Sequence, residues 1–355
     1  MQFITALQDT QFFNPVYGTG DLKKGQTYYT FGQFARETID RGLARPLEPA
    51  PVAITRFMPT HLDGPDRPRR VLLMFAGGLG DAITVGIVLP TAMARHNLHF
   101  DICCDPKKWE GIFQPMALPG RPIPFPPDLD ILSGYEAVLC DISDFFPIKE
   151  GLKVSPVIQL MQGFHIHDPL IRVAYRIPAE IGQRMLLPAT DRKRIGLNLD
   201  SNGRIKSYPL KLYEALFSTL RSLDLDLHLF GNKSLTPDLS NGDGLFDWRG
   251  KADIPELAAL LAQMDIVLGV DSFIVHLADL LEKTSLVLLG TTAPTYFDWH
   301  RHIACLQSGL DCSPCFAFAD QCPKGYAACK AFEQPGIRPD VIAQTVHSLL
   351  YKRPL

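Results

Sequence analysis

The stretch RRVLLMFAGGLGD at residues 69–81 decides the fold. Its apolar run at residues 71–75 is short and uninterrupted, which is typical of a strand buried on both faces of a parallel sheet. Glycines and an aspartate follow it, and residues 81–95 have the composition of a helix. A buried strand, a glycine-rich turn and a helix begin a βα unit, so the sequence predicts an α/β fold.

The same alternation of strands and helices continues along the chain. A polar, basic segment at residues 186–194 interrupts it, and a new apolar strand at residues 195–198 then starts it again. Because 355 residues exceed what one hydrophobic core usually supports, we predict two successive α/β units. The further expected strands are residues 99–103, 136–140, 225–230, 266–268 and 286–289. The further expected helices are residues 155–164, 209–220, 257–264 and 339–351.

These patterns predict four parts of the chain. Residues 1–69 are rich in turns and prolines without a clear period, which indicates an irregular N-terminal extension. Residues 70–188 form the N-terminal domain, and residues 189–335 form the C-terminal domain with a cysteine-rich loop at residues 305–329. Residues 336–355 carry the terminal helix. The strand at residues 225–230 alternates apolar with acidic and histidine residues, which predicts a half-exposed strand with Asp224 and Asp226 facing solvent.

The composition excludes some classes of function. A formal net charge of -3 gives no basic field, so we expect no nucleic-acid partner. The first residues lack a basic segment followed by an apolar one, and no run approaches the roughly 20 apolar residues that span a bilayer. We therefore expect a cytoplasmic protein with at most peripheral membrane contact.

The glycine-rich turn is the first candidate site. Gly78 and Gly80 let a ligand approach the backbone, and the helix that follows presents unpaired N–H groups to negative charge. The third glycine of a dinucleotide fingerprint is replaced by Ile83, and the turn has no lysine of a phosphate-binding loop. Asp81 is then either a first-turn acid that the helix dipole favours or a general base for an acceptor hydroxyl.

The second candidate is Lys206, in the loop after the first strand of the C-terminal domain. A lysine there can neutralise a diphosphate leaving group, although a solvated lysine is the commoner fate. Asn198, which ends that strand, is a further candidate for binding the same ligand.

The third candidate lies where the strand near residues 266–268 gives way to a helix. Asp271 and Ser272 are both good helix N-caps, yet the carboxyl ends of parallel strands are also where ligands of α/β sheets gather. His276 follows Ser272 by four residues and can face the same region, or it is a partly buried histidine with an ordinary structural role.

The order of these motifs resembles glycosyltransferase family 9, the ADP-heptose:lipopolysaccharide heptosyltransferases and their relatives. Gly-Gly-Leu-Gly-Asp comes first, Lys-Ser-Tyr-Pro-Leu second and Asp-Ser-Phe-Ile-Val-His-Leu-Ala third, and a loop at residues 290–294 and a Cys-Ser-Pro-Cys segment follow. The similarity runs from Arg70 to the C-terminus. It departs from the family at Phe273, where glycine is usual, and at Ala293 in the loop.

The resemblance implies the GT-B fold, two Rossmann-like domains with a cleft between them. It also implies inverting transfer of a sugar from a nucleotide-diphosphate donor such as ADP-heptose to a saccharide, lipid-linked saccharide or protein acceptor, as in lipopolysaccharide biosynthesis. Asp81 matches the proposed catalytic base, Lys206 the donor-phosphate lysine, and Asp271, Ser272 and His276 the donor-binding helix start. No cofactor is implied for catalysis.

Two other functions remain open at this stage. The changes at Phe273 and Ala293 are compatible with a sugar-nucleotide-binding or assembly module that has lost activity. A nicotinamide-dependent oxidoreductase is the second, because Asp101 or Asp105 follows the glycine turn at roughly the spacing of a ribose-binding acid. The missing third glycine and the repeated α/β unit disfavour it.

Four cysteines form a separate candidate site with the spacing C-x2-C-x6-C-x6-C. They are Cys312, Cys315, Cys322 and Cys329. Four thiolates in so short a segment can close a tetrahedral structural site for zinc or iron, whereas reduced thiols without metal are the alternative. Four sulfur ligands leave no open position, so a catalytic metal is not expected here.

Overall fold

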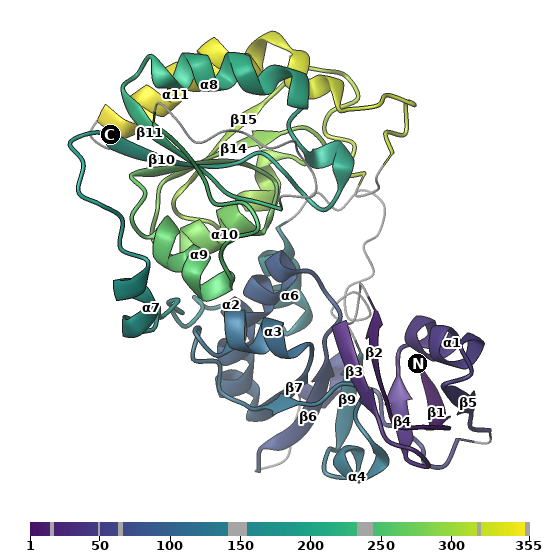
Figure 1. Cartoon of the computed structure of the whole chain (residues 1–355). Helices are drawn as coiled ribbons and strands as arrows, with labels where there is room; N and C mark the ends of the chain where they lie inside the picture. Colours follow the sequence, from purple (N-terminus) through teal and green to yellow (C-terminus); the bar gives the residue numbers. More distant parts are fainter. Residues whose placement is uncertain are drawn as a thin grey trace. The chain divides into compact units, whose positions relative to one another are not determined.

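The computed structural model describes residues 1–14, 18–48, 50–62, 67–140, 155–232, 244–317 and 321–351. Contacts divide the chain into two compact units (Figure 1). Unit 1 comprises Met1–Leu152 and Pro156–Val173, and unit 2 comprises Lys153–Ser155 and Ala174–Leu355. Each contains a parallel sheet with helices, so the predicted α/β class is confirmed.

The N-terminal part of unit 1 is more regular than the sequence indicated. β1 (Gln2–Ala6) pairs antiparallel with β4 (Thr27–Thr30) and β5 (Ala44–Pro46). β2 (Thr10–Asn14) and β3 (Gly18–Leu22) form a hairpin, and α1 spans Gly32–Asp40. None of these strands exceeds 5 residues, which is too short to give the clear period that we sought in the sequence.

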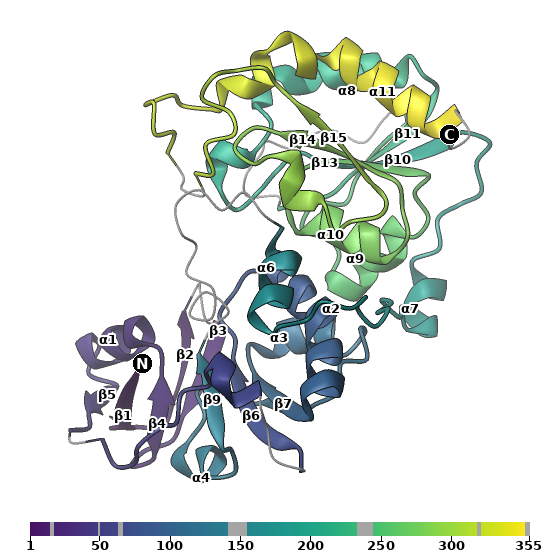
Figure 2. The ribbon, with the colours of Figure 1, turned by 180° about the vertical axis from the view of Figure 1, so that it is seen from behind.

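These N-terminal strands share a hydrophobic core with the parallel sheet of unit 1. Phe3, Ile4 and Phe34 are buried in one cluster with Leu72 and Met74. The backbone N–H of Tyr29 also donates to the carbonyl of Pro127 at 3.0 Å. Figure 2 shows β1, β4 and β5 beside β9 and β6. The N-terminal strands and α1 therefore pack onto the sheet as part of unit 1.

The parallel sheet of unit 1 has the strand order β8-β7-β6-β9. Its strands are β6 (Arg69–Met74), β7 (Leu98–Cys103), β8 (Pro122–Ile123) and β9 (Ala137–Cys140). The helices of this part are η1 (Pro59–Leu62), α2 (Leu79–His96), α3 (Pro106–Lys108), η2 (Trp109–Phe113), α4 (Leu129–Leu132) and α6 (Pro156–Gly163). In chain order the strands run third, second, first, fourth, so the order reverses between β6 and β9.

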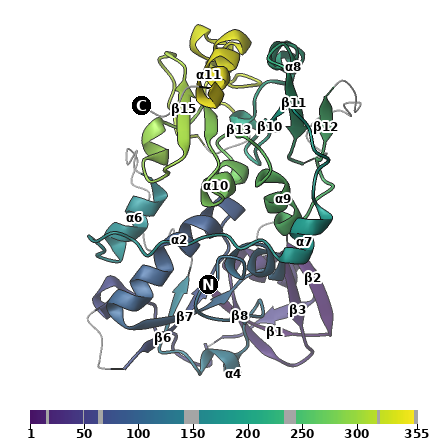
Figure 3. The ribbon, with the colours of Figure 1, turned by 90° about the vertical axis from the view of Figure 1, so that its left-hand side faces the viewer.

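The sheet of unit 2 has six parallel strands in the order β12-β11-β10-β13-β14-β15. Figure 3 labels β12, β11, β10, β13 and β15 in this order. The strands are β10 (Lys193–Asn198), β11 (Leu225–Leu229), β12 (Leu245–Asp247), β13 (Ile266–Val270), β14 (Ser285–Leu289) and β15 (Ile303–Gln307). This is the 3-2-1-4-5-6 order of a Rossmann sheet, and its order reverses between β10 and β13.

Helices cover both faces of this sheet. α8 (Tyr213–Arg221) and α11 (Pro339–Tyr351) lie on one face, and α9 (Ile254–Leu261) and α10 (Phe273–Leu280) lie on the other (Figure 1). Because both faces are covered, the central strands are buried along their length, as every residue of β11, β13 and β14 is. The remaining helices are α7 (Ala179–Arg184), η3 (Arg204–Lys206), η4 (Leu210–Leu212), η6 (Pro294–Phe297), η7 (Lys330–Glu333) and η8 (Pro335–Ile337).

The prediction of a half-exposed strand at residues 225–230 was wrong. All five residues of β11 are buried, because the strand lies inside a sheet that helices cover on both faces. Asp226 is 7% exposed and pairs with Arg192, whose Nη1 lies 3.2 Å from its Oδ1. The side chain of Asp224, just before the strand, is 84% exposed as expected.

The segment before β10 belongs with unit 2 by its contacts. Arg184 of α7 donates to Glu256 of α9 at 2.6 Å, and the N–H of Leu187 donates to Gln263 at 2.8 Å. The division by contacts therefore falls at Val173/Ala174, earlier in the chain than the polar segment that we used to place a boundary. Within the described residues, no helix has the length and apolar character needed to cross a membrane.

Candidate functional site

The glycine turn of unit 1 lies at the carboxyl end of β6, where the strand order reverses. Gly78 caps α2, and its N–H donates to Oδ2 of Asp81 at 2.8 Å. A Cβ at Gly77 would lie 2.8 Å from the ring of Phe75, so the close turn requires glycine there. Asp81 is exposed. The turn thus presents an exposed carboxylate at the start of an 18-residue helix.

Asp81 performs the structural role that the sequence left open. Its carboxylate satisfies a backbone N–H of the turn and lies in the first helical turn, where the helix dipole favours negative charge. This role does not exclude a second one, because an exposed carboxylate remains accessible to a substrate hydroxyl. Gly80 contributes through its carbonyl, which accepts from Thr84 Oγ1 at 3.2 Å.

In unit 2 the predicted donor-binding residues meet where the strand order reverses. β10 ends at Asn198, which is in register with Gly269 of β13. A Cβ at Gly269 would lie 2.8 Å from Cγ1 of Val275 and 3.2 Å from the carbonyl oxygen of Asn198, so only glycine fits. Asp271 and Ser272 follow directly after β13. The reversal point of an open α/β sheet is the usual place for a ligand.

Lys206 and Asp271 form an ion pair at this edge. Lys206 Nζ lies 3.1 Å from Asp271 Oδ2, and the two side chains are only 16% and 7% exposed. η3, which follows the loop after β10, positions the lysine. Low exposure to solvent strengthens the interaction of each charge with a nearby group, while Asp271 offsets part of the positive charge of Lys206.

Ser272 and Asn198 join the two central strand ends. Ser272 is the N-cap of α10, but its hydroxyl makes no capping hydrogen bond and donates instead to Oδ1 of Asn198. Asn198 Nδ2 in turn donates to the carbonyl of Phe230 at 3.4 Å. The prediction that Ser272 lies at a helix start is confirmed, although its side chain contacts β10 rather than its own helix.

His276 lies one turn into α10 and contacts a residue that the sequence did not indicate. Its Nδ1 lies 2.8 Å from Nε2 of His300, and its ring stacks on Phe297 with centroids 5.5 Å apart. Burial, then the neighbouring His300 and Lys206, hold the pKa of His276 well below its usual value. Burial also lowers the pKa of His300. Both rings are therefore neutral near pH 7.

The four cysteines of the candidate metal site are free thiols. Burial raises the pKa of Cys329, and the thiols of Cys315, Cys322 and Cys312 raise it further. The loop is held to the end of β14, because Ser313 Oγ donates to the carbonyl of Gly290 at 2.6 Å. Within the part of the chain that is described, no three histidine, cysteine or acidic side chains are placed to hold a metal ion.

Comparison with known proteins gives a sequence match to one family. Residues 175–325 match glycosyltransferase family 9 (heptosyltransferase). This segment carries a glycosyltransferase family 9 domain. The matched segment contains β10 through β15 and all the residues of unit 2 that were predicted to bind the donor. A search of curated proteins finds no match.

Solved structures extend the similarity to most of the chain. ADP-heptose lps heptosyltransferase II of E. coli has 13% identity and a TM-score of 0.60, with 79% of this chain and 98% of that one covered. The iron-containing dodecameric glycosyltransferase TibC of enterotoxigenic E. coli H10407 has 14% identity and a TM-score of 0.62, with 81% of each chain covered. TibC in complex with ADP-D-beta-D-heptose has 13% identity and a TM-score of 0.59, with 88% and 82% covered.

At these identities the likeness shows the fold, and the predicted GT-B class is confirmed. Five of the predicted site residues come together in unit 2, namely Asn198, Lys206, Asp271, Ser272 and His276. Asp81, Gly78 and Gly80 belong to the turn of unit 1. His300 was missed because it lies in an irregular loop 24 residues after His276, and nothing in the local sequence marks it.

Proposed function

We propose that this protein transfers a sugar from a nucleotide-diphosphate donor such as ADP-heptose to a saccharide, lipid-linked saccharide or protein acceptor, with inversion at the anomeric carbon. One observation carries the proposal, the buried Lys206–Asp271 pair at the strand-order reversal of a glycosyltransferase family 9 domain. The fold shared with a heptosyltransferase solved with ADP-heptose supports the choice of donor class.

The proposal assigns the donor to residues 189–335 and the acceptor to residues 70–188. Lys206 would neutralise the diphosphate, and the backbone N–H groups at the start of α10 would add hydrogen bonds to it. Asp271 would hold the lysine in place through its 3.1 Å ion pair. Fixed positive charge of this kind stabilises a leaving diphosphate without a divalent ion.

In the proposed reaction Asp81 acts as the general base. Its carboxylate accepts the proton of the acceptor hydroxyl, and the oxygen attacks the anomeric carbon from the face opposite the diphosphate. The new carbon–oxygen bond forms as the bond to the phosphate oxygen breaks, and the electron pair leaves with the nucleoside diphosphate. The exposed position of Asp81 at a helix start supports this role, since the turn holds the carboxylate in place through Gly78.

We also propose a structural metal, zinc or iron, on Cys312, Cys315, Cys322 and Cys329. The donor set fits by chemistry, because all four thiols are free and three of them raise the pKa of the fourth. The described side chains do not converge on one point, so binding requires them to reorient. Metal analysis of the purified protein, before and after Cys322→Ser, tests this. A metal-free wild-type protein would refute it.

The proposed location is the cytoplasm. None of the described cysteines forms a disulfide, which suits a reducing compartment.

A panel of nucleotide sugars tests the proposed function. A ligand that binds the folded state raises the melting temperature, so ADP-heptose or a related donor should stabilise the wild-type protein, whereas NAD should not. Transfer to candidate acceptors is then measured with the donor that binds. Stabilisation without transfer would favour the inactive binding module, and stabilisation by NAD alone would favour the oxidoreductase.

Two lysine variants separate the site from general surface charge. Lys206→Met should weaken donor binding by about tenfold or more, because a charge-assisted hydrogen bond to the diphosphate is lost. Lys211→Met is the matched control, since Lys211 is 61% exposed and pairs with Glu333. Equal losses in both variants would contradict the proposed donor site.

A further inference from the structure

His276 and His300 belong to a chain of hydrogen bonds that starts at a backbone carbonyl. Nδ1 of His300 lies 3.3 Å from the carbonyl oxygen of Phe297, and Nε2 of His300 lies 2.8 Å from Nδ1 of His276. In this series of hydrogen bonds, each neighbour determines whether a ring nitrogen donates or accepts.

The assignment begins at Phe297, because a carbonyl oxygen only accepts. Nδ1 of His300 must therefore carry a hydrogen. A neutral imidazole has one N–H, so Nε2 of His300 is unprotonated and accepts. Nδ1 of His276 is then the donor of the 2.8 Å bond, which leaves Nε2 of His276 unprotonated.

The surroundings keep both rings neutral. Burial lowers the pKa of both histidines, and Lys206 further opposes a positive charge on His276. Asp279 and Asp271 act in the opposite sense on His300, without outweighing burial. The two-histidine chain therefore has one stable arrangement of hydrogens.

Packing holds the rings in this geometry. Phe297 is 3% exposed and contacts both rings, with centroids 5.5 Å from His276 and 5.4 Å from His300. Asp279 of α10 accepts from the N–H groups of Arg301 at 3.1 Å and His302 at 2.9 Å. The loop that carries His300 is thus fastened to the same helix that carries His276.

We propose that His300 is a positioning residue that fixes His276 in the Nδ1–H tautomer, so that Nε2 of His276 accepts a hydrogen bond from a hydroxyl of the sugar nucleotide. The part concerning the ligand rests on the proposed function. An unprotonated nitrogen cannot donate to a phosphate oxygen. Lys206 therefore binds the diphosphate, and His276 accepts a hydrogen bond from a hydroxyl of the sugar or the ribose.

Nitrogen-15 NMR of the histidine rings in the full chain tests the tautomer directly. At pH 7.5, Nδ1 of His276 should have the shift of a protonated nitrogen and Nε2 that of an unprotonated one. His300→Phe removes the acceptor, so His276 should shift toward the other tautomer. His300→Gln keeps an acceptor oxygen and should restore most of the wild-type pattern. A wild-type His276 that is Nε2–H or doubly protonated would overturn the proposal.

Binding of ADP-heptose and ADP supplies the second readout. His300→Phe should weaken ADP-heptose binding by about tenfold, the effect of losing one hydrogen bond, and His300→Gln should recover it. If ADP is weakened equally, the hydroxyl is on the ribose, and if ADP is unaffected, it is on the sugar. His302→Phe is the control. His302 bonds Asp279 through its backbone N–H, which the substitution leaves in place.

The two proposals fail in different ways. Unchanged binding of ADP-heptose in His300→Phe, with the tautomer altered, would refute the hydroxyl contact while leaving the donor site intact. If no nucleotide sugar binds the wild-type protein but the NMR pattern is as expected, the proposed function fails and the role of His300 as a positioning residue stands.

Discussion

The two places where strand order reverses differ in how far their carboxylates are exposed to solvent. In unit 1 the carboxylate of Asp81 is exposed and bonded to a backbone N–H. In unit 2 the carboxylate of Asp271 is 7% exposed and paired with Lys206. An exposed carboxylate can exchange protons with a substrate, whereas a buried ion pair provides a fixed field. The difference suits a base in unit 1 and a diphosphate site in unit 2.

Unit 1 also has a buried charge, but not at the glycine turn. Asp101 of β7 is fully buried and accepts from Tyr135 at 2.7 Å and from Arg121 at 3.0 Å. Burial raises the pKa of Asp101, yet the hydrogen bonds from Tyr135 and Arg121 together outweigh it and hold the pKa below its usual value. This buried carboxylate has a structural role. The effect of losing a buried charge on stability can therefore be measured at Asp101, separately from the effect on activity at Asp81.

The largest expected effect is on chemistry at Asp81. Asp81→Asn should lower kcat by about 10²–10⁴-fold, because the amide cannot take up the acceptor proton. Its oxygen can still accept from Gly78, so the turn and donor affinity should change little. Asp128→Asn, at the N-cap of α4, is the matched control. Steady-state kinetics and donor titration of the two variants measure kcat and donor affinity. Retained turnover in Asp81→Asn would show that Asp81 is not the general base.

The second effect is on stability at Asp101. Asp101→Asn should lower the free energy of unfolding by about 1–3 kcal/mol near pH 7, since buried donors lose a charged partner. The folded pKa is depressed, so this contribution is present above the usual pKa of 3.8 and is lost as pH falls through the folded value. Urea unfolding should show a smaller difference in unfolding free energy between the wild-type protein and Asp101→Asn at pH 3 than at pH 7. A larger difference at pH 3 would contradict the structural role of the ionised Asp101 carboxylate.

The third effect distinguishes the two candidate sites by stability alone. Lys206→Met should cost about 1–2 kcal/mol of unfolding free energy, because it leaves Asp271 buried without its cation. Asp81→Asn should cost about 0.3–1 kcal/mol, because the negative charge at the helix start is lost while the amide oxygen can still accept from Gly78. Thermal and urea unfolding of both variants measure this. Equal costs would mean that the two sites do not differ as the structure indicates.

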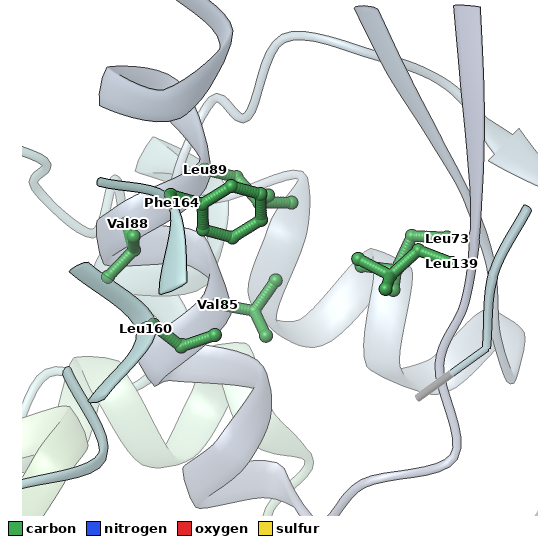
Figure 4. Close-up of a pocket in the computed structure, with 7 residues that line it drawn as sticks. All are labelled: Leu73, Val85, Val88, Leu89, Leu139, Leu160 and Phe164. Carbon is green, nitrogen blue, oxygen red and sulfur yellow. The ribbon is translucent and has the colours of Figure 1, made fainter. Parts of the chain in front are cut away.

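The smallest effect concerns the support of the glycine turn. A cavity of about 10 Å³ lies beneath α2, the helix that begins at the turn, and only apolar side chains line it (Figure 4). Its lining residues are Leu73, Val85, Val88, Leu89, Leu139, Leu160 and Phe164. Val88→Ile should fill the space and add about 0.5–1 kcal/mol of stability. Val71→Ile, in fully packed β6, should instead destabilise the protein, which calorimetry would show.

The sequence by itself determined the two α/β repeats. A short apolar run, a glycine turn and a helix each leave a local pattern, because burial on both faces of a parallel strand removes polar residues from it. The same logic located Asp81, Lys206, Asp271 and Ser272, since these residues lie just after strands or at helix starts, where α/β sheets place ligand-binding groups. Their chemical roles remain proposals.

The tertiary structure alone decided what depends on contacts between distant residues. The N-terminal strands are too short to show a period, and their order comes from packing on the sheet of unit 1. Asp226 is buried because β11 belongs to a sheet with helices on both faces, which its alternating sequence did not reveal. His300 reaches His276 only because the loop after β14 is fastened to α10. Local sequence encodes periodicity and turns, whereas burial and partnership are set by which segments the fold brings together.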